Sequence, residues 1–144
     1  MENILVSACL VGLNCKYNGK NNYNPKILEL MKKYNFILIC PEFDGGLSIP
    51  RDPSEILGDK VISSNGVDVT SNYNNGANHA LELAKIYKCK KALLKEKSPS
   101  CGKDCTYDGT FTHTLINRPG VCAKLLLENN IEVYGESEID ELLK

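Results

Sequence analysis

Three short apolar runs along the chain are each followed closely by a cysteine. Two of them, residues 4–9 and 36–40, end on the cysteine itself, and the third, residues 92–94, leads into a turn rich in proline, serine and glycine. Continuous apolar runs of this length are typical of strands buried on both faces of a parallel sheet. The carboxyl ends of parallel strands meet at one edge, so the pattern predicts that three thiols converge there: Cys9, Cys40 and Cys101.

Helical periodicity separates these runs. Asn24 is expected to cap a helix that has Pro25 at its first position. Its apolar side is predicted to hold Ile27, Leu28, Leu30, Met31 and Tyr34. Similar patterns predict a helix from residue 70 or 71 to 87, a helix over 121–130, a last strand over 131–134 and a closing helix over 138–143.

Two other segments complete the predicted fold. Asn65-Gly66 lies between β-rich stretches at residues 60–64 and 67–70 and is typical of a two-residue hairpin turn. Residues 41–55 are predicted to form a long irregular loop. Strands that alternate with helices predict an α/β fold, here a single doubly wound domain over residues 1–144. We expect a mostly parallel four-stranded sheet in the order 2-1-3-4 with an extra β-hairpin, and a ligand site beyond the carboxyl ends of its strands.

Composition narrows the classes of partner. The chain has 144 residues and a formal net charge of -1, so it lacks the basic footprint that sequence-independent nucleic-acid binding needs. Transfer RNA stays possible through a local basic patch of Lys16, Lys20 and Lys103, but the overall charge does not support it. The sequence has no run of membrane-spanning length and no signal-peptide pattern at its start. We expect a cytoplasmic protein with a small-molecule partner and no membrane.

Seven cysteines point to metal ligation or thiol chemistry rather than to disulfides in a reducing compartment. Cys89 and Cys122 fit small core residues. Cys15 and Cys105 lie in loops near the predicted edge and are reserve candidates, because a single C-x3-C pair is unlike the usual zinc and iron motifs. Soft thiolates select iron–sulfur clusters, zinc or cuprous copper, and three of them leave an open coordination position that is typical of a catalytic centre.

Polar residues accompany the cysteines at this edge. Glu42 follows Cys40 by two positions, and Ser98 and Ser100 precede Cys101. The same carboxylate could instead cap a helix or loop. Arg51 is expected to anchor a loop through Asp44 or Asp52, with the binding of a polar substrate group as the alternative. His79 and His113 show no zinc-ligand spacing and are expected to be structural or solvent-facing.

The order of these motifs resembles a known family. The motifs are Ser7-Ala8-Cys9-Leu10-Val11-Gly12, Cys15-Lys16-Tyr17-Asn18-Gly19, Cys40-Pro41-Glu42, Gly45-Gly46-Leu47, Pro50-Arg51 and Lys97-Ser98-Pro99-Ser100-Cys101-Gly102. Over about residues 4 to 135 the sequence resembles the thiouracil desulfidase family. It departs from that family's common pattern at Asn18, where an aspartate is usual, and at Cys105, which is an addition.

The resemblance implies a Rossmann-like domain that holds a 4Fe-4S cluster. Cys9, Cys40 and Cys101 would be its ligands, and the fourth iron would be free to take the sulfur of a thiolated base. Glu42 and a serine of the Ser98–Ser100 turn would be the acid–base groups, with the choice between the two serines open. The implied activity is a non-redox desulfuration of a thiouracil-like base or nucleoside that releases hydrosulfide.

Two other functions compete with this hypothesis. The first is a non-catalytic cysteine-ligated metal or cluster protein, a redox sensor or sulfide carrier, in which Cys15 or Cys105 supplies a fourth ligand. The second is a metal-free thiol enzyme that uses Cys101 as its nucleophile, activated by Lys97 or Lys103.

Overall fold

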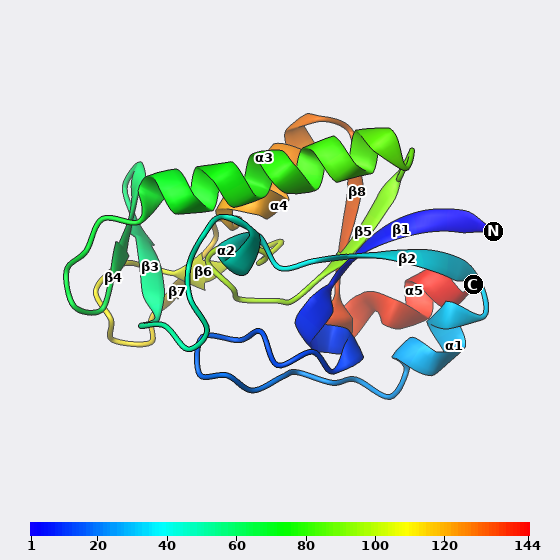
Figure 1. Cartoon of the computed structure of the whole chain (residues 1–144), viewed down its shortest axis with the longest axis horizontal. Helices are drawn as coiled ribbons and strands as arrows, with labels where there is room; N and C mark the ends of the chain where they lie inside the picture. Colours follow the sequence, from blue (N-terminus) through cyan, green and yellow to red (C-terminus); the bar gives the residue numbers. More distant parts are fainter.

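A four-stranded parallel sheet forms the centre of the computed structural model, which describes residues 1–144. Its strands are β1 (Glu2–Ser7), β2 (Tyr34–Ile39), β5 (Lys91–Leu94) and β8 (Glu132–Gly135). They lie side by side in the order β2-β1-β5-β8, and every neighbouring pair is parallel (Figure 1). This is the predicted order 2-1-3-4, so the α/β expectation is confirmed.

Helices cover both faces of the sheet. On one face lie α3 (Thr70–Ile86) and α4 (Val121–Glu128), and on the other lie α1 (Ile27–Met31) and α5 (Ile139–Leu143) (Figure 1). The side chains of β1 alternate between two cores, Leu5 packing under α3 and α4 and its neighbours Ile4 and Val6 packing toward α1 and α5. Because both faces are buried, the strand reads as a continuous apolar run. None of the helices combines the length and apolarity that a membrane span needs.

The first helix is shorter than predicted. Leu28 and Met31 are 55% and 45% exposed, and Tyr34 is not on the helix at all but begins β2, where it is 4% exposed. Asn24 closes a turn by accepting a hydrogen bond from the backbone of Lys26, one turn before the helical residues. A spacing of three and four residues fits a single helical turn next to a strand as well as it fits a longer helix.

The extra β-hairpin exists, but its pairing differs from the prediction. The paired strands are β3 (Ser54–Leu57) and β4 (Lys60–Ser63), so the predicted loop over 41–55 ends in a strand. Asn65-Gly66 does turn the chain, with Gly66 at a φ of 86°, yet the following residues add only an isolated bridge to β4. A second small hairpin pairs β6 (Thr106–Tyr107) with β7 (Leu115–Ile116).

Three short helices were not predicted. They are η1 (Ala8–Val11), α2 (Pro41–Asp44) and η2 (Glu136–Glu138). η1 and α2 follow β1 and β2 directly, so Cys9 lies within η1 and Cys40 immediately before α2. Each of these turns begins at the carboxyl edge of the sheet, which is where the predicted site residues lie.

Close contact between α2 and α3 fixes the position of α2. Gly76 of α3 lies against Pro41, and a Cβ atom at Gly76 would overlap the Pro41 carbonyl oxygen. Asn72 of α3 donates a hydrogen bond of 2.9 Å from Nδ2 to the carbonyl oxygen of Gly45. This side of α3 therefore positions the chain that follows Cys40.

Replacing Gly76 with alanine is expected to destabilise the fold by about 1–3 kcal/mol, because the added methyl group forces two backbones apart. Chemical denaturation of the purified variant measures this change. Asn75→Ala, on the exposed side of the same helix, is the matched control and should be neutral or slightly stabilising, since alanine is the better helix former. A Gly76→Ala variant as stable as the parent would contradict the packing argument.

Candidate active site

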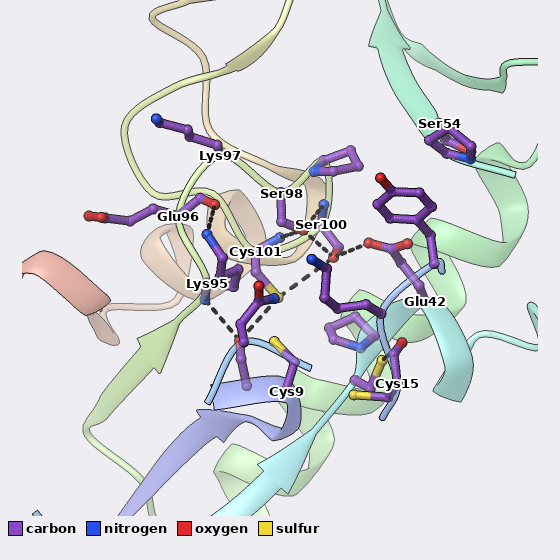
Figure 2. A pocket seen from close by; sticks show the side chains of 18 of the residues that line it. Cys9, Cys15, Glu42, Ser54, Lys95, Glu96, Lys97, Ser98, Ser100 and Cys101 are labelled. Atoms are coloured by element: carbon purple, nitrogen blue, oxygen red, sulfur yellow. Dashed lines mark hydrogen bonds between the residues drawn. The ribbon is translucent and has the colours of Figure 1, made fainter. Parts of the chain in front are cut away.

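The carboxyl ends of β1, β2 and β5 open into a cavity of about 550 Å³. The three thiols predicted to meet at this edge, those of Cys9, Cys40 and Cys101, all line it. In Figure 2 the side chains of Cys9 and Cys101 approach each other across the floor of the cavity. The sheet topology therefore brings together cysteines that lie far apart in the sequence.

The spacing of these thiols bears on the kind of metal centre they suit. No group of three or more His, Cys, Asp or Glu side chains lies close enough to hold a single metal ion. Sulfur ligands of one zinc ion lie about 2.3 Å from the metal and therefore crowd together. In an iron–sulfur cluster each cysteine binds a different iron, so its ligands stand farther apart. Three soft donors around one cavity thus fit a cluster better than a single ion.

Ser7 at the end of β1 directs a hydroxyl group at Cys101. Its Oγ accepts a hydrogen bond of 3.0 Å from the backbone N–H of Lys95 and lies 3.4 Å from the Cys101 Sγ. The side chain is buried, so the hydroxyl hydrogen is left to point at the sulfur. Hydrogen bonds to ligand sulfurs tune iron–sulfur centres. Sequence reasoning could not find this contact, because a serine at the end of a strand is common.

The surroundings of the thiols shift their pKa values in different directions. Burial raises the pKa of Cys9, and it raises the pKa of Cys101 to about 12. The pKa of Cys40 is lowered to about 7, chiefly because its thiolate can accept hydrogen bonds from the Cys15 thiol and from the backbone of Phe43. Burial thus disfavours the thiolate form of Cys101, which is the form a thiol nucleophile needs. Lys103, one of its two candidate activators, instead forms an ion pair of 2.9 Å with Glu138.

Glu42 and Ser100 meet beside the cysteines. The Ser100 hydroxyl donates a hydrogen bond of 3.0 Å to Oε2 of Glu42 and lies 3.6 Å from the Cys101 Sγ (Figure 2). Glu42 is positioned by α2 and Ser100 by the turn after β5. A carboxylate, a hydroxyl group and a thiol thus form a continuous polar contact, which is the arrangement needed to move a proton between a water molecule and a leaving group.

The two serines of the turn have different contacts. The Ser98 Oγ accepts hydrogen bonds from the backbone N–H groups of Ser100 and Cys101, at 3.2 and 3.1 Å, and lies 3.0 Å from the Ser100 Oγ. Ser98 therefore stabilises the turn, whereas Ser100 contacts the carboxylate. The first residues of α4 hold the same turn from behind, since the backbone N–H of Cys122 donates to the Ser100 carbonyl at 2.8 Å.

Arg51 pairs with Glu42 and with neither of the two aspartates expected from the sequence. Its Nε lies 3.1 Å from Oε1 of Glu42, and its Nη2 donates to the Cys15 carbonyl at 2.9 Å. The side chain of Arg51 is only 8% exposed. Asp44 instead accepts a hydrogen bond from the backbone of Cys40. The sequence could not show this pairing, because it depends on α2 turning Glu42 back toward the loop that carries Arg51.

The other four cysteines lie in different surroundings. Cys15 lines the cavity next to Cys40, whereas Cys105 does not line it. Cys89 and Cys122 are buried in the core under α3 and α4, as predicted. Of the two reserve candidates, only Cys15 is placed to affect a centre held by the trio.

The mouth of the cavity carries a different set of side chains. Of the three lysines in the expected basic patch, only Lys16 lines the cavity. Lys103 is paired with Glu138. His79 is solvent-facing on α3. His113 is also exposed, as predicted, but it lies at the rim of the cavity.

Comparison with known proteins gives a consistent assignment. A family model described as 2-thiouracil desulfurase matches residues 4–138. An uncharacterized protein of Bacillus subtilis (strain 168), YbbK, is 39% identical over an alignment of 150 positions that spans 97% of this chain and 99% of YbbK. The solved structure of the 4Fe-4S-dependent thiouracil desulfidase TudS superposes with a TM-score of 0.93 at 37% identity, over 99% of this chain and 95% of that one. The chain therefore belongs to the 2-thiouracil desulfurase family.

Proposed function

We propose that this protein is an iron–sulfur-dependent desulfidase that converts the thiocarbonyl group of a thiolated pyrimidine base to a carbonyl group and releases hydrosulfide. The observation that carries the proposal is the cavity in which three thiols face a hydrogen-bonded carboxylate and hydroxyl. The family assignment and the description of TudS as a 4Fe-4S-dependent thiouracil desulfidase support it.

Cys9, Cys40 and Cys101 would hold a 4Fe-4S cluster as its three protein ligands. When bound, such a cluster supplies one iron without a protein ligand, a Lewis acid with an affinity for sulfur. Hydrogen bonding supports the ligand role of Cys101, because Ser7 directs its hydroxyl group at the sulfur, and the Ser100 Oγ lies 3.6 Å from the same atom. The burial that disfavours a bare thiolate at Cys101 also favours a site in which metal charge compensates it.

Glu42 would act as the general base. Arg51 engages Oε1, which leaves Oε2 directed into the cavity toward Ser100. From this position the carboxylate would take a proton from the water molecule that attacks the thiocarbonyl carbon. General-base assistance of this kind contributes about 100- to 10,000-fold.

Ser100 would carry the proton onward. Its hydroxyl contacts both the Glu42 carboxylate and the sulfur of Cys101, so it spans the distance between the base and the region of the leaving sulfur. Ser98 would act as a positioning residue, because it binds the backbone of the turn that presents Ser100.

The overall reaction is balanced without an electron donor. The C=S double bond is replaced by a C=O double bond whose oxygen comes from water. The sulfur leaves as hydrosulfide with one proton of that water, the other proton is released, and the oxidation state of the carbon does not change. The non-catalytic alternative would require a fourth ligand to the centre. Cys105 lies outside the lining of the cavity, which leaves Cys15 as the candidate for that ligand.

The substrate would be a free thiolated base or nucleoside. A cavity of about 550 Å³ is of the size that takes small molecules. The formal net charge of -1 gives no overall basic excess for transfer RNA, and Lys103 of the expected basic patch is paired with Glu138.

Anaerobic reconstitution with iron and sulfide is expected to give a cluster spectrum and release of sulfide from 2-thiouracil. Single alanine variants of Cys9, Cys40 and Cys101 should lose both, because each removes one of three ligands. Cys105→Ser is the matched control and should keep the iron content of the parent. Cluster loss in the control with retention in the trio would refute the assignment, and a fully active protein free of iron would favour a thiol enzyme.

Glu42→Gln is expected to lower kcat by about 100- to 10,000-fold while the cluster spectrum stays unchanged, because the amide cannot accept a proton from water. Uracil formation measured by chromatography gives the rate. Glu96→Gln serves as the control, since the Glu96 carboxylate lies at the rim of the cavity and accepts a hydrogen bond from Ser137 instead. Equal rates for Glu42→Gln and the parent would remove Glu42 from the mechanism.

A further inference from the structure

Three aromatic side chains from one short segment line the mouth of the cavity: Tyr107, Phe111 and His113. We call this set the aromatic wall. Tyr107 is the last residue of β6, Phe111 and His113 lie in the loop between β6 and β7, and no part of the desulfuration chemistry above uses them. The side chains of the wall are more exposed than the floor, since Phe111 is 38% exposed whereas Cys101 is 4% exposed. The wall therefore stands between the reacting groups and solvent.

Threonines alternate with cavity-lining aromatic residues along positions 110–114 of the loop. Thr110, Thr112 and Thr114 form a chain of hydroxyl contacts, at 2.6 and 2.9 Å, and none of the three lines the cavity. Phe111 and His113, the residues between them, do line it, and both adopt the left-handed backbone conformation with φ of 59° and 60°. Non-glycine residues adopt this conformation at a cost in free energy, and such residues cluster at functional sites.

Buried polar groups hold the loop in this shape. Oε1 of Glu55, a residue that is 8% exposed, accepts hydrogen bonds from the backbone N–H groups of Gly109 and Phe111 at 3.0 and 3.1 Å. Arg118 donates at 2.7 Å to the carbonyl groups of Ile56 and Tyr107 and so ties the loop to β3. The loop is thus anchored at its start and near its tip, and the aromatic wall is preorganised.

The rings themselves also contact one another. Tyr107 and His113 meet edge to face, with ring centroids 5.9 Å apart. Phe111 takes no part in that pair and lines the same cavity. An aromatic ring at a cavity mouth with no aromatic partner of its own is available to stack on a planar ligand.

We propose that the aromatic wall binds the ring face of the substrate, with Phe111 as the main contact, and that it makes the enzyme selective for ring-borne thiocarbonyl groups over acyclic thioamides. This inference rests on the proposed function. A thiolated base whose sulfur is directed toward the cysteines on the floor has its ring toward the mouth, where the wall lies. An acyclic thioamide such as thiourea presents the same C=S group but has no ring to stack.

The selectivity is tested by comparing kcat/KM for 2-thiouracil and for thiourea in the cluster-loaded protein. In Phe111→Ala the value for 2-thiouracil is expected to fall by about 10- to 100-fold, mainly through KM, because base–aromatic stacking is lost. The value for thiourea should not change. Phe111→Tyr keeps the ring and should restore the preference, and Asn75→Ala, on the exposed side of α3 and outside the cavity lining, should behave as the parent does. The cluster spectrum of each variant reports whether the site is intact.

Several outcomes would overturn the inference. Equal losses for both substrates in Phe111→Ala would indicate a structural role, and unchanged values for both would exclude stacking. If the loaded parent releases sulfide from neither compound, the proposed function fails instead. Calorimetric titration with uracil then decides the role of the wall. Binding that is about 10-fold weaker in Phe111→Ala supports it, and equal affinity in the two proteins overturns it.

Discussion

The parallel pairing of β1 with both of its neighbours is the constraint on which the rest of the structure depends. β1 pairs with β2 over six residues, and the last pair joins Ser7 to Ile39. On its other side Val6 pairs with Leu93 of β5. These pairs align the carboxyl ends of three strands, so the three cysteines that follow these strands line one cavity. Because both faces of the sheet are buried, a slip in this register would disrupt both cores.

A second interaction joins the loops that the sheet alone would leave apart. Glu42 contacts Arg51 through one oxygen and Ser100 through the other. Arg51 also binds the backbone of Cys15. The segments after all three strands are therefore linked through one carboxylate. A buried charge is tolerated only when it is paired and hydrogen-bonded, and here each of these contacts also orients a group at the cavity.

The strand order and the convergence of Cys9, Cys40 and Cys101 could be predicted, because continuous apolar runs followed by cysteines carry both signals in one segment. The apolar spacing gave a wrong prediction at Tyr34, because one helical turn followed by a strand has the same spacing as a longer helix. The turn at Gly66 was wrongly assigned to the hairpin, because another turn lies just before it in the sequence. The pairing of Glu42 with Arg51 and the contact of Ser7 with Cys101 depend on tertiary placement. The separate contacts of Ser98 and Ser100 could not be seen in the sequence either, because both serines occupy the same turn.

The three thiols follow three different strands, so they meet only when the sheet is assembled. No hairpin or single βαβ unit of this chain contains the complete ligand set, because β5 must join β1 before Cys101 reaches the cavity. A cluster held by the trio would thus bind the folded chain in preference to the unfolded one. Its binding energy would then add to the stability of the whole sheet, so folding and loading would be linked, although the ligands themselves are far apart in the sequence.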